Sequence, residues 1–180
     1  MPLWYPERSH VNLIRAWLAA RFFPEYEETS PSPLFGAVQG PEGEAALDSA
    51  LNLIHQPYYR GVYNKAGALL RSMIKNHPFV DGNKRIALVT TFDFLMMNRH
   101  LLALATNKEM VRFAVEVAKS EPDMPWQDVA AWIRGNTVPF SASKRLIRAK
   151  LRNRSPEVVR QRIRHVARVL DDLEHLSLST

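Results

Sequence analysis

The sequence predicts an all-α fold in which a bundle of helices surrounds one central helix. Apolar residues recur at spacings of three and four along nearly every segment, which is the period of an amphipathic helix. No series of alternating apolar and polar residues marks a sheet. The run IALVTTFDFLMMN at 86–98 is apolar on nearly all sides. A helix with that pattern is expected to be covered by other helices.

The first helix is expected within 9–23, with Ser9 as its candidate cap. Pro24 ends it, because proline cannot continue a helix. The stretch that follows is rich in proline, glycine and small polar residues and is therefore expected to be loop. Within that loop, 34–39 is the one candidate for a short extended strand or hairpin.

Further helices are expected along the rest of the chain. They cover 44–55, 62–75, a segment that begins near Gly82 or Asn83 and contains the run at 86–98, then 106–119 and 125–134.

The stretch at 135–143 is expected to separate a domain at 1–140 from a basic helical C-terminal extension at 141–180. A short basic helix is predicted at its start. A second helix begins at 155–157, where a capping serine, a proline and an acid follow one another. The apolar stripe of this second helix suits docking on the body or pairing with another helix.

Composition excludes several classes of protein. The 180 residues include no cysteine, so disulfides and thiolate chemistry are excluded. The N-terminus lacks the pattern of a signal peptide, and no apolar run is long enough to span a bilayer. We therefore expect a cytoplasmic protein without a membrane partner.

The net charge of +6 lies entirely in the C-terminal extension. Residues 1–140 contain 14 Lys+Arg and 14 Asp+Glu, whereas 141–180 contain ten Lys+Arg and four Asp+Glu. This asymmetry suggests an acidic partner or RNA at 141–180. The alternative is a basic helix face that is simply solvated.

The stretch KNHPFVDGNKRIAL at 75–88 places many polar groups directly before the apolar run. If a helix starts near Gly82 or Asn83, the main-chain N–H groups of its first turn have no partner within the helix and lie at the positive end of its dipole. Lys84 and Arg85 add positive charge where the dipole disfavours it. The arrangement predicts a bound anion such as a phosphate.

Three residues beside this anion site suggest chemistry. Asp81 is placed to hold Mg²⁺, with helix capping as its alternative role. His77 could take a proton from an attacking hydroxyl, and Phe79 is expected to bury its ring and fix the loop. Together they suggest attack of a hydroxyl on a nucleotide phosphate.

The segment HPFVDGNKR at 77–85 resembles, at every fixed position, the signature H-P-F-x-[DE]-G-N-[GK]-R of the Fic/Doc (filamentation and death-on-curing) family. A weaker resemblance extends from Gly36 to Arg134 and leaves 141–180 outside. The resemblance implies a helical bundle with a small β-hairpin flap. It also implies transfer of part of a nucleotide to a hydroxyl of a target protein, with ATP as donor and Mg²⁺ as cofactor.

The resemblance also assigns roles to residues. It implies His77 as the general base, Asp81 as the metal ligand and Phe79 as the loop anchor. The implied phosphate-binding set is Gly82, Asn83, Lys84 and Arg85. The implied flap, formed by Leu34, Phe35, Gly36, Ala37 and Val38, would hold an extended segment of the target by main-chain pairing.

Two positions resemble the death-on-curing branch of the family. Lys84 stands where the AMP-transferring branch typically has glycine, and Leu88 stands where that branch has a second arginine. The death-on-curing toxin is similar to a kinase and phosphorylates a threonine of elongation factor Tu. Gly82, however, is the residue usual in the AMP-transferring branch, so AMP transfer remains the alternative to phosphoryl transfer. A non-catalytic binding protein that acts through the basic tail is a second alternative.

Toxins of this family are held in check by an antitoxin, either a separate chain or an inhibitory helix in the same chain. The inhibitory pattern, Ser or Thr followed after three residues by Glu and then Gly or Asn, does not occur in this sequence. The resemblance therefore implies a separate antitoxin.

Overall fold

The structure is a computed structural model that describes residues 2–22, 35–142 and 144–164. It is mostly helical, which confirms the all-α prediction. The elements in chain order are α1 (Arg8–Phe22), α2 (Gly40–Leu53), α3 (Val62–Lys75), α4 (Asn83–Met97), β1 (His100–Leu102), α5 (Asn107–Lys119), α6 (Trp126–Asn136), β2 (Thr137–Pro139) and α7 (Lys144–Lys150). A further helical segment covers 156–164.

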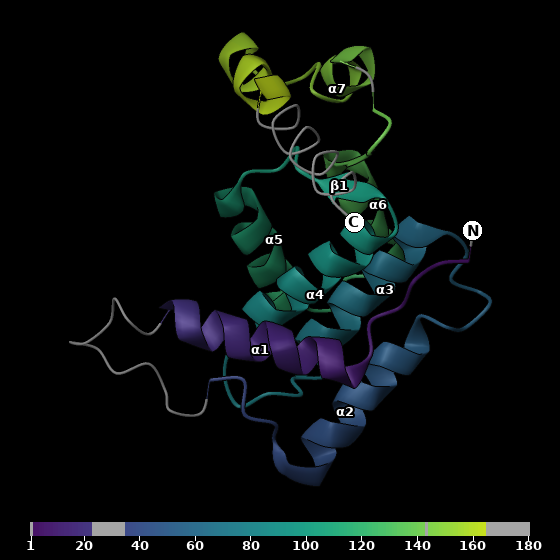
Figure 1. The fold of residues 1–180 in the computed structure, drawn as a ribbon, viewed down its shortest axis with the longest axis vertical. Coiled ribbons are helices and arrows are strands. Elements are labelled where there is room, and N and C mark those ends of the chain that lie inside the picture. The colour runs from purple at the N-terminus through teal and green to yellow at the C-terminus, as the bar shows by residue number, and fades with distance from the viewer. Residues whose placement is uncertain (1, 23–34, 143, 165–180) are drawn as a thin grey trace, which may run out of the picture.

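Helix α4 is the central element of the bundle (Figure 1). It packs against α1, α3 and α5 and against strand β1. Ile86, Phe94 and Leu95 on α4 are fully buried in the main hydrophobic core. Burial of these side chains fixes the position of the helix and hence of its N-terminus.

Local sequence sets several helix ends. α3 spans the predicted residues, and α5 begins at a capping box. The Thr106 hydroxyl accepts a hydrogen bond from the Glu109 N–H at 3.1 Å, while the Glu109 carboxylate accepts one from the Thr106 N–H at 2.7 Å. α1 already begins at Arg8, so the prediction that Ser9 caps it is wrong.

Strands β1 and β2 form an antiparallel sheet that the sequence analysis did not predict. Leu101 pairs with Val138 in its centre. Each strand is only three residues long and follows a helix directly or nearly so, so neither shows a strand period of its own. The predicted extended segment at 34–39, of which Leu34 lies outside the described residues, instead forms isolated bridges to the loop before α4.

The start of the C-terminal extension packs on this sheet. Ile147 and Leu151 are almost completely buried against Leu101 and Val138. Val159 and Ile163 of the next helix also pack against this cluster, which contains residues of both the body and the extension. The later residues of that helix lie outside the described part of the chain. Among the described residues, no helix is both long and apolar enough to cross a membrane.

The contact between α3 and α6 generates a test of the packing. A Cβ atom at Gly67 on α3 would lie 2.6 Å from the backbone nitrogen of Ala130 on α6, whereas one at Gly135 would meet nothing within 4 Å. Gly67→Ala is therefore expected to lower the free energy of unfolding by about 1–3 kcal/mol through overpacking. Gly135→Ala should raise it by up to about 1 kcal/mol, because alanine favours the helix. Urea unfolding of both variants checks this, and equal stabilities would contradict the packing described.

Candidate active site

The polar motif forms the loop between α3 and α4. α3 ends at Asn76, whose N–H donates to the Ser72 carbonyl at 2.9 Å. The chain then runs through His77 to Gly82, where α4 begins. The loop therefore joins two helices of the main core, and both of its ends are fixed by packing.

His77 is exposed and has a φ of +46°, in the left-handed region. It occupies the position directly after the helix cap, where left-handed residues commonly end helices and glycine is the usual choice. A side chain there is strained by about 1–2 kcal/mol. Strain of this kind is typical of functional sites, where the surrounding structure holds a residue in place.

Asn83 fixes the loop from the first position of α4. Its Oδ1 accepts a hydrogen bond from the Phe79 N–H at 2.9 Å, and its Nδ2 donates to the Phe79 carbonyl at 2.6 Å. Phe79 is fully buried and Asn83 is 7 % exposed. The amide oxygen and one amide N–H of Asn83 therefore bind the loop, and these bonds leave the second amide N–H unused. The main-chain N–H of Asn83 lies in the first turn of α4, where it has no partner within the helix.

The extended segment at 35–39 lies along the motif loop. Gly36 donates its N–H to the Asp81 carbonyl at 2.9 Å, and the Ala37 carbonyl accepts from Val80 at 2.8 Å. Gln39 donates its main-chain N–H to the Pro78 carbonyl at 3.0 Å and its side-chain amide to the Phe79 carbonyl at 3.0 Å. One edge of the expected flap is thus bonded to the loop, and an extended target segment could pair with the other edge.

Gly82 is required at the start of α4 for two reasons. Its φ is +87°, and a Cβ there would lie 2.6 Å from the ring of Phe35. The ring therefore packs on the glycine backbone and connects the segment at 35–39 to the helix start. Any side chain at this position would displace Phe35 and strain the turn.

The N-terminus of α4 carries positive charge. Lys84 and Arg85 are exposed in its first turn, which contains no acidic residue. The dipole and the first-turn N–H groups add to this charge, so the end of the helix can hold phosphate oxygens. Asp81 is exposed beside it, with one carboxylate oxygen accepting from the Gly82 N–H at 2.6 Å.

The donor set suits Mg²⁺ together with a nucleotide. The described residues contain no group of three or more acidic or histidine side chains that could bind a metal by themselves. Mg²⁺ commonly binds through one carboxylate, with phosphate oxygens and waters completing its shell. Asp81 next to a phosphate-binding helix end supplies that combination.

Arg15 on α1 belongs to the site but was not found from the sequence. Its guanidinium carbon lies 5.3 Å from the centre of the Phe79 ring, and its Nη1 donates to Asn12 at 2.8 Å. A Cβ at Gly36 would come within 3.2 Å of its Nε. Burial lowers the pKa of Arg15. Arg15 contacts both the motif loop and the segment at 35–39. The sequence analysis missed it because contacts between distant segments do not appear in the helical periodicity.

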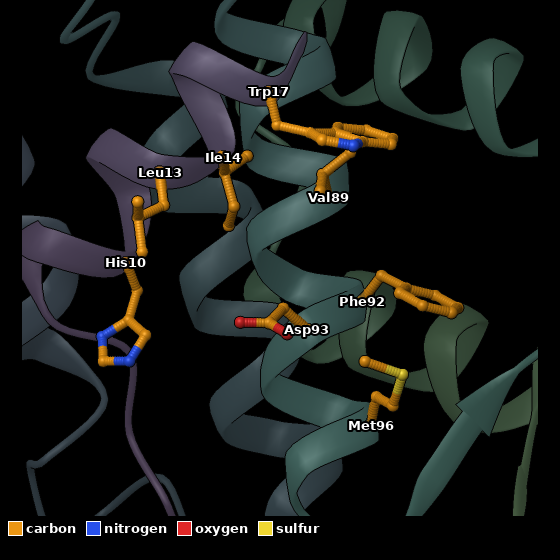
Figure 2. A pocket seen from close by; sticks show the side chains of 8 residues that line it. All are labelled: His10, Leu13, Ile14, Trp17, Val89, Phe92, Asp93 and Met96. Carbon is orange, nitrogen blue, oxygen red and sulfur yellow. The ribbon is translucent and has the colours of Figure 1, made fainter. Parts of the chain in front are cut away.

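A groove of about 400 Å³ lies between α1 and α4 (Figure 2). Its lining is apolar except for Asp93 on α4 and His10 on α1. Leu13 and Trp17 on α1 are 70 % and 52 % exposed. Burial raises the pKa of Asp93, an effect that the nearby His10 opposes. The described residues therefore leave part of this face of the central helix open between α1 and α4. The other lining residues are Ile14, Val89, Phe92 and Met96.

Comparison with known proteins identifies relatives of this chain. A sequence model of the Fic/DOC family matches residues 5–95, from before α1 almost to the end of α4. The resemblance described from the sequence runs from Gly36 to Arg134, so the matched range begins earlier and ends earlier. Toxin Doc of Mycolicibacterium smegmatis is 47 % identical to this chain over 45 residues, which cover 25 % of this chain and 35 % of that protein. The match thus spans about a third of that relative's length.

The left-handed conformation of His77 generates a test that needs no assay of activity. His77→Ala leaves a strained side-chain-bearing residue in place, whereas His77→Gly removes the strain. The glycine variant is expected to be more stable than the alanine variant by about 1 kcal/mol, as measured by urea unfolding. An alanine variant as stable as the glycine variant would show that position 77 is not held at positive φ.

Proposed function

Because the chain belongs to the Fic/DOC family, we propose that it is a Doc-like toxin that transfers the γ-phosphoryl group of ATP to a serine or threonine hydroxyl of a target protein. The candidate target is elongation factor Tu, whose modification in the cytoplasm would block translation. One observation carries the proposal. The exposed His77 and Asp81 lie in the loop that leads into a helix N-terminus with two exposed cations and no acid.

The helix end binds and orients the donor. The main-chain N–H groups of the first turn of α4, with Lys84 and Arg85, hold phosphate oxygens of ATP. Because Ile86, Phe94 and Leu95 anchor α4 in the core and Asn83 fixes the loop, these groups are held in place before the nucleotide arrives. Preorganised donors of this kind stabilise the charge of a phosphoryl group in transfer.

His77 acts as the general base. It accepts the proton of the target hydroxyl while the hydroxyl oxygen forms a bond to the γ-phosphorus. The bond between that phosphorus and the bridging oxygen breaks, ADP leaves with the electron pair, and His77 passes the proton on to water. The target segment pairs in extended form with the main chain of the flap, so that its hydroxyl reaches His77.

Asp81 would hold the Mg²⁺ ion through its exposed carboxylate. When bound, the ion supplies positive charge to the phosphate oxygens of the nucleotide.

AMP transfer is the alternative reaction of the same site. In that case the target hydroxyl attacks the α-phosphorus and pyrophosphate leaves. Gly82 is the feature that favours this alternative, whereas Lys84 and Leu88 favour phosphoryl transfer. A lysine at the anion site changes which phosphate it holds, and leucine at 88 provides no cationic clamp for the far phosphate.

Labelled ATP distinguishes the two reactions. The purified protein, incubated with Mg²⁺ and elongation factor Tu, is expected to label the target from γ-labelled ATP and not from α-labelled ATP. His77→Ala should slow the transfer by about 10²–10⁴-fold, because general base catalysis is lost. Label from α-labelled ATP would instead establish AMP transfer.

Growth inhibition provides the control for the second alternative. A toxin that acts by catalysis loses its effect on growth in the His77→Ala variant. A non-catalytic binding protein that acts through its basic tail would keep that effect and would transfer neither label.

The groove between α1 and α4 is the surface that we assign to a separate antitoxin. It combines exposed apolar side chains with one half-buried carboxylate, Asp93, which forms no ion pair with another described residue. A segment with apolar side chains and one lysine or arginine facing Asp93 complements both features.

Asp93→Asn tests this assignment because its two expected effects have opposite signs. The raised pKa means that the folded protein favours protonated Asp93, so stability falls as pH rises above the ordinary pKa of aspartate. At neutral pH the neutral Asn should therefore make the free protein more stable, yet weaken antitoxin binding about tenfold or more. Unfolding curves of the free protein and calorimetry with its purified antitoxin measure these effects. The control Glu121→Gln, at an exposed carboxylate outside the helices, should change neither appreciably. Unchanged affinity in Asp93→Asn would contradict the assignment.

A further inference from the structure

The described part of the C-terminal extension is fixed on the body and presents arginines outward. α7 and the helix at 156–164 each bury one side, through Ile147 and Leu151 and through Val159 and Ile163, in the cluster that includes strand β1. The two helices lie together at the end of the molecule away from α2 (Figure 1). Their outward faces therefore have a defined position on the folded protein.

We name the exposed arginines of these two helices and their connection the arginine surface. Arg145 and Arg148 are three residues apart on α7, Arg152 follows four residues later, and Arg160 and Arg164 are four apart on the next helix. All five side chains are exposed. At these spacings like charges repel each other across a helix face. A bound polyanion would relieve that repulsion.

Within the described part of the extension, few anions compensate this charge. Residues 144–164 contain nine Lys+Arg and one acid, Glu157. Arg154 forms an ion pair with Glu109 of α5, and Lys150 donates to the Arg134 carbonyl at 2.5 Å, so these two are engaged with the body. They are not counted in the arginine surface.

The surface is separate from the catalytic motif. The motif lies at the N-terminus of α4, whereas α7 packs on β1, which follows the C-terminus of the same helix. α4 has 15 residues, so its two ends are about 22 Å apart. The arginine surface therefore cannot belong to the nucleotide site.

The residues around the arginines favour a duplex nucleic acid over a protein. Protein interfaces have an apolar or aromatic centre, but the single large exposed apolar side chain at 144–164 is Leu146, at 38 %. Proteins that bind single strands stack bases on aromatic side chains, and 144–164 contain none. Arginine, which binds phosphate through two N–H groups, supplies seven of the nine cations.

We propose that the arginine surface binds the phosphate backbone of double-stranded RNA without reading its sequence. The choice of RNA over DNA rests on the proposed function, because a toxin that acts on the translation machinery meets structured RNA next to its target. Arginines on two helices can contact the phosphate backbone of an A-form RNA duplex. Such contacts depend on the shape of the duplex and need no access to base edges.

Binding of a 20-base-pair RNA duplex to the full chain, followed by fluorescence anisotropy, tests the proposal. Five arginine–phosphate contacts predict that affinity falls about 10²–10³-fold between 50 and 200 mM salt. The triple variant Arg145→Gln, Arg148→Gln, Arg152→Gln should bind at least about tenfold more weakly and with a shallower salt dependence. The matched control Arg60→Gln, Lys108→Gln, Lys119→Gln removes the same charge from exposed sites elsewhere and should change affinity less than about threefold.

Three results in the binding assay would each overturn the proposal. Equal weakening in the two triple variants would indicate a general charge effect, and tighter binding of a DNA duplex would exclude RNA as the preferred partner. Tighter binding of polyglutamate would indicate an acidic protein. The triple arginine variant should keep transfer to a purified target in the labelled-ATP assay. Loss of transfer in the wild type with intact RNA binding would refute the proposed reaction but not the arginine surface.

Discussion

The anchoring of Phe79 is the interaction on which the rest of the site depends. The ring is fully buried, the Asn83 amide binds both polar groups of its main chain, and Arg15 lies over the ring. These contacts hold the loop at 76–82, between two core helices, in one conformation. They direct His77 and Asp81 outward and account for the left-handed strain at His77, which a less constrained loop would release.

The central helix separates surfaces of different chemistry. Its N-terminus offers N–H groups and cations to phosphate, and its middle leaves an apolar face open beside α1. Beyond its C-terminus, strand β1 supports the arginine-bearing extension. The core fixes the spacing of these three surfaces, because all of them adjoin the same helix.

Much of the fold and the site could be predicted from the sequence, because the signals are local. The period of α3, the capping box of α5 and the fixed residues of 77–85 all lie within short windows. Contacts between distant segments left no such signal. These include Arg15 on Phe79, the ring of Phe35 on Gly82 and the pairing of β1 with β2. Asn83 illustrates the difference: its presence in the motif was clear, but its partner was not.

The sequence alone determined that the chain is helical, that a helix start with two cations follows a histidine and an acid, and that positive charge gathers after residue 140. It could do so because helical period, first-turn N–H groups and charge are properties of neighbouring residues. Only the tertiary structure decided that Asn83 serves the loop, that His77 is held under strain and that the described segments leave one face of the central helix open. Those outcomes depend on packing between segments far apart in the chain, which no local pattern encodes.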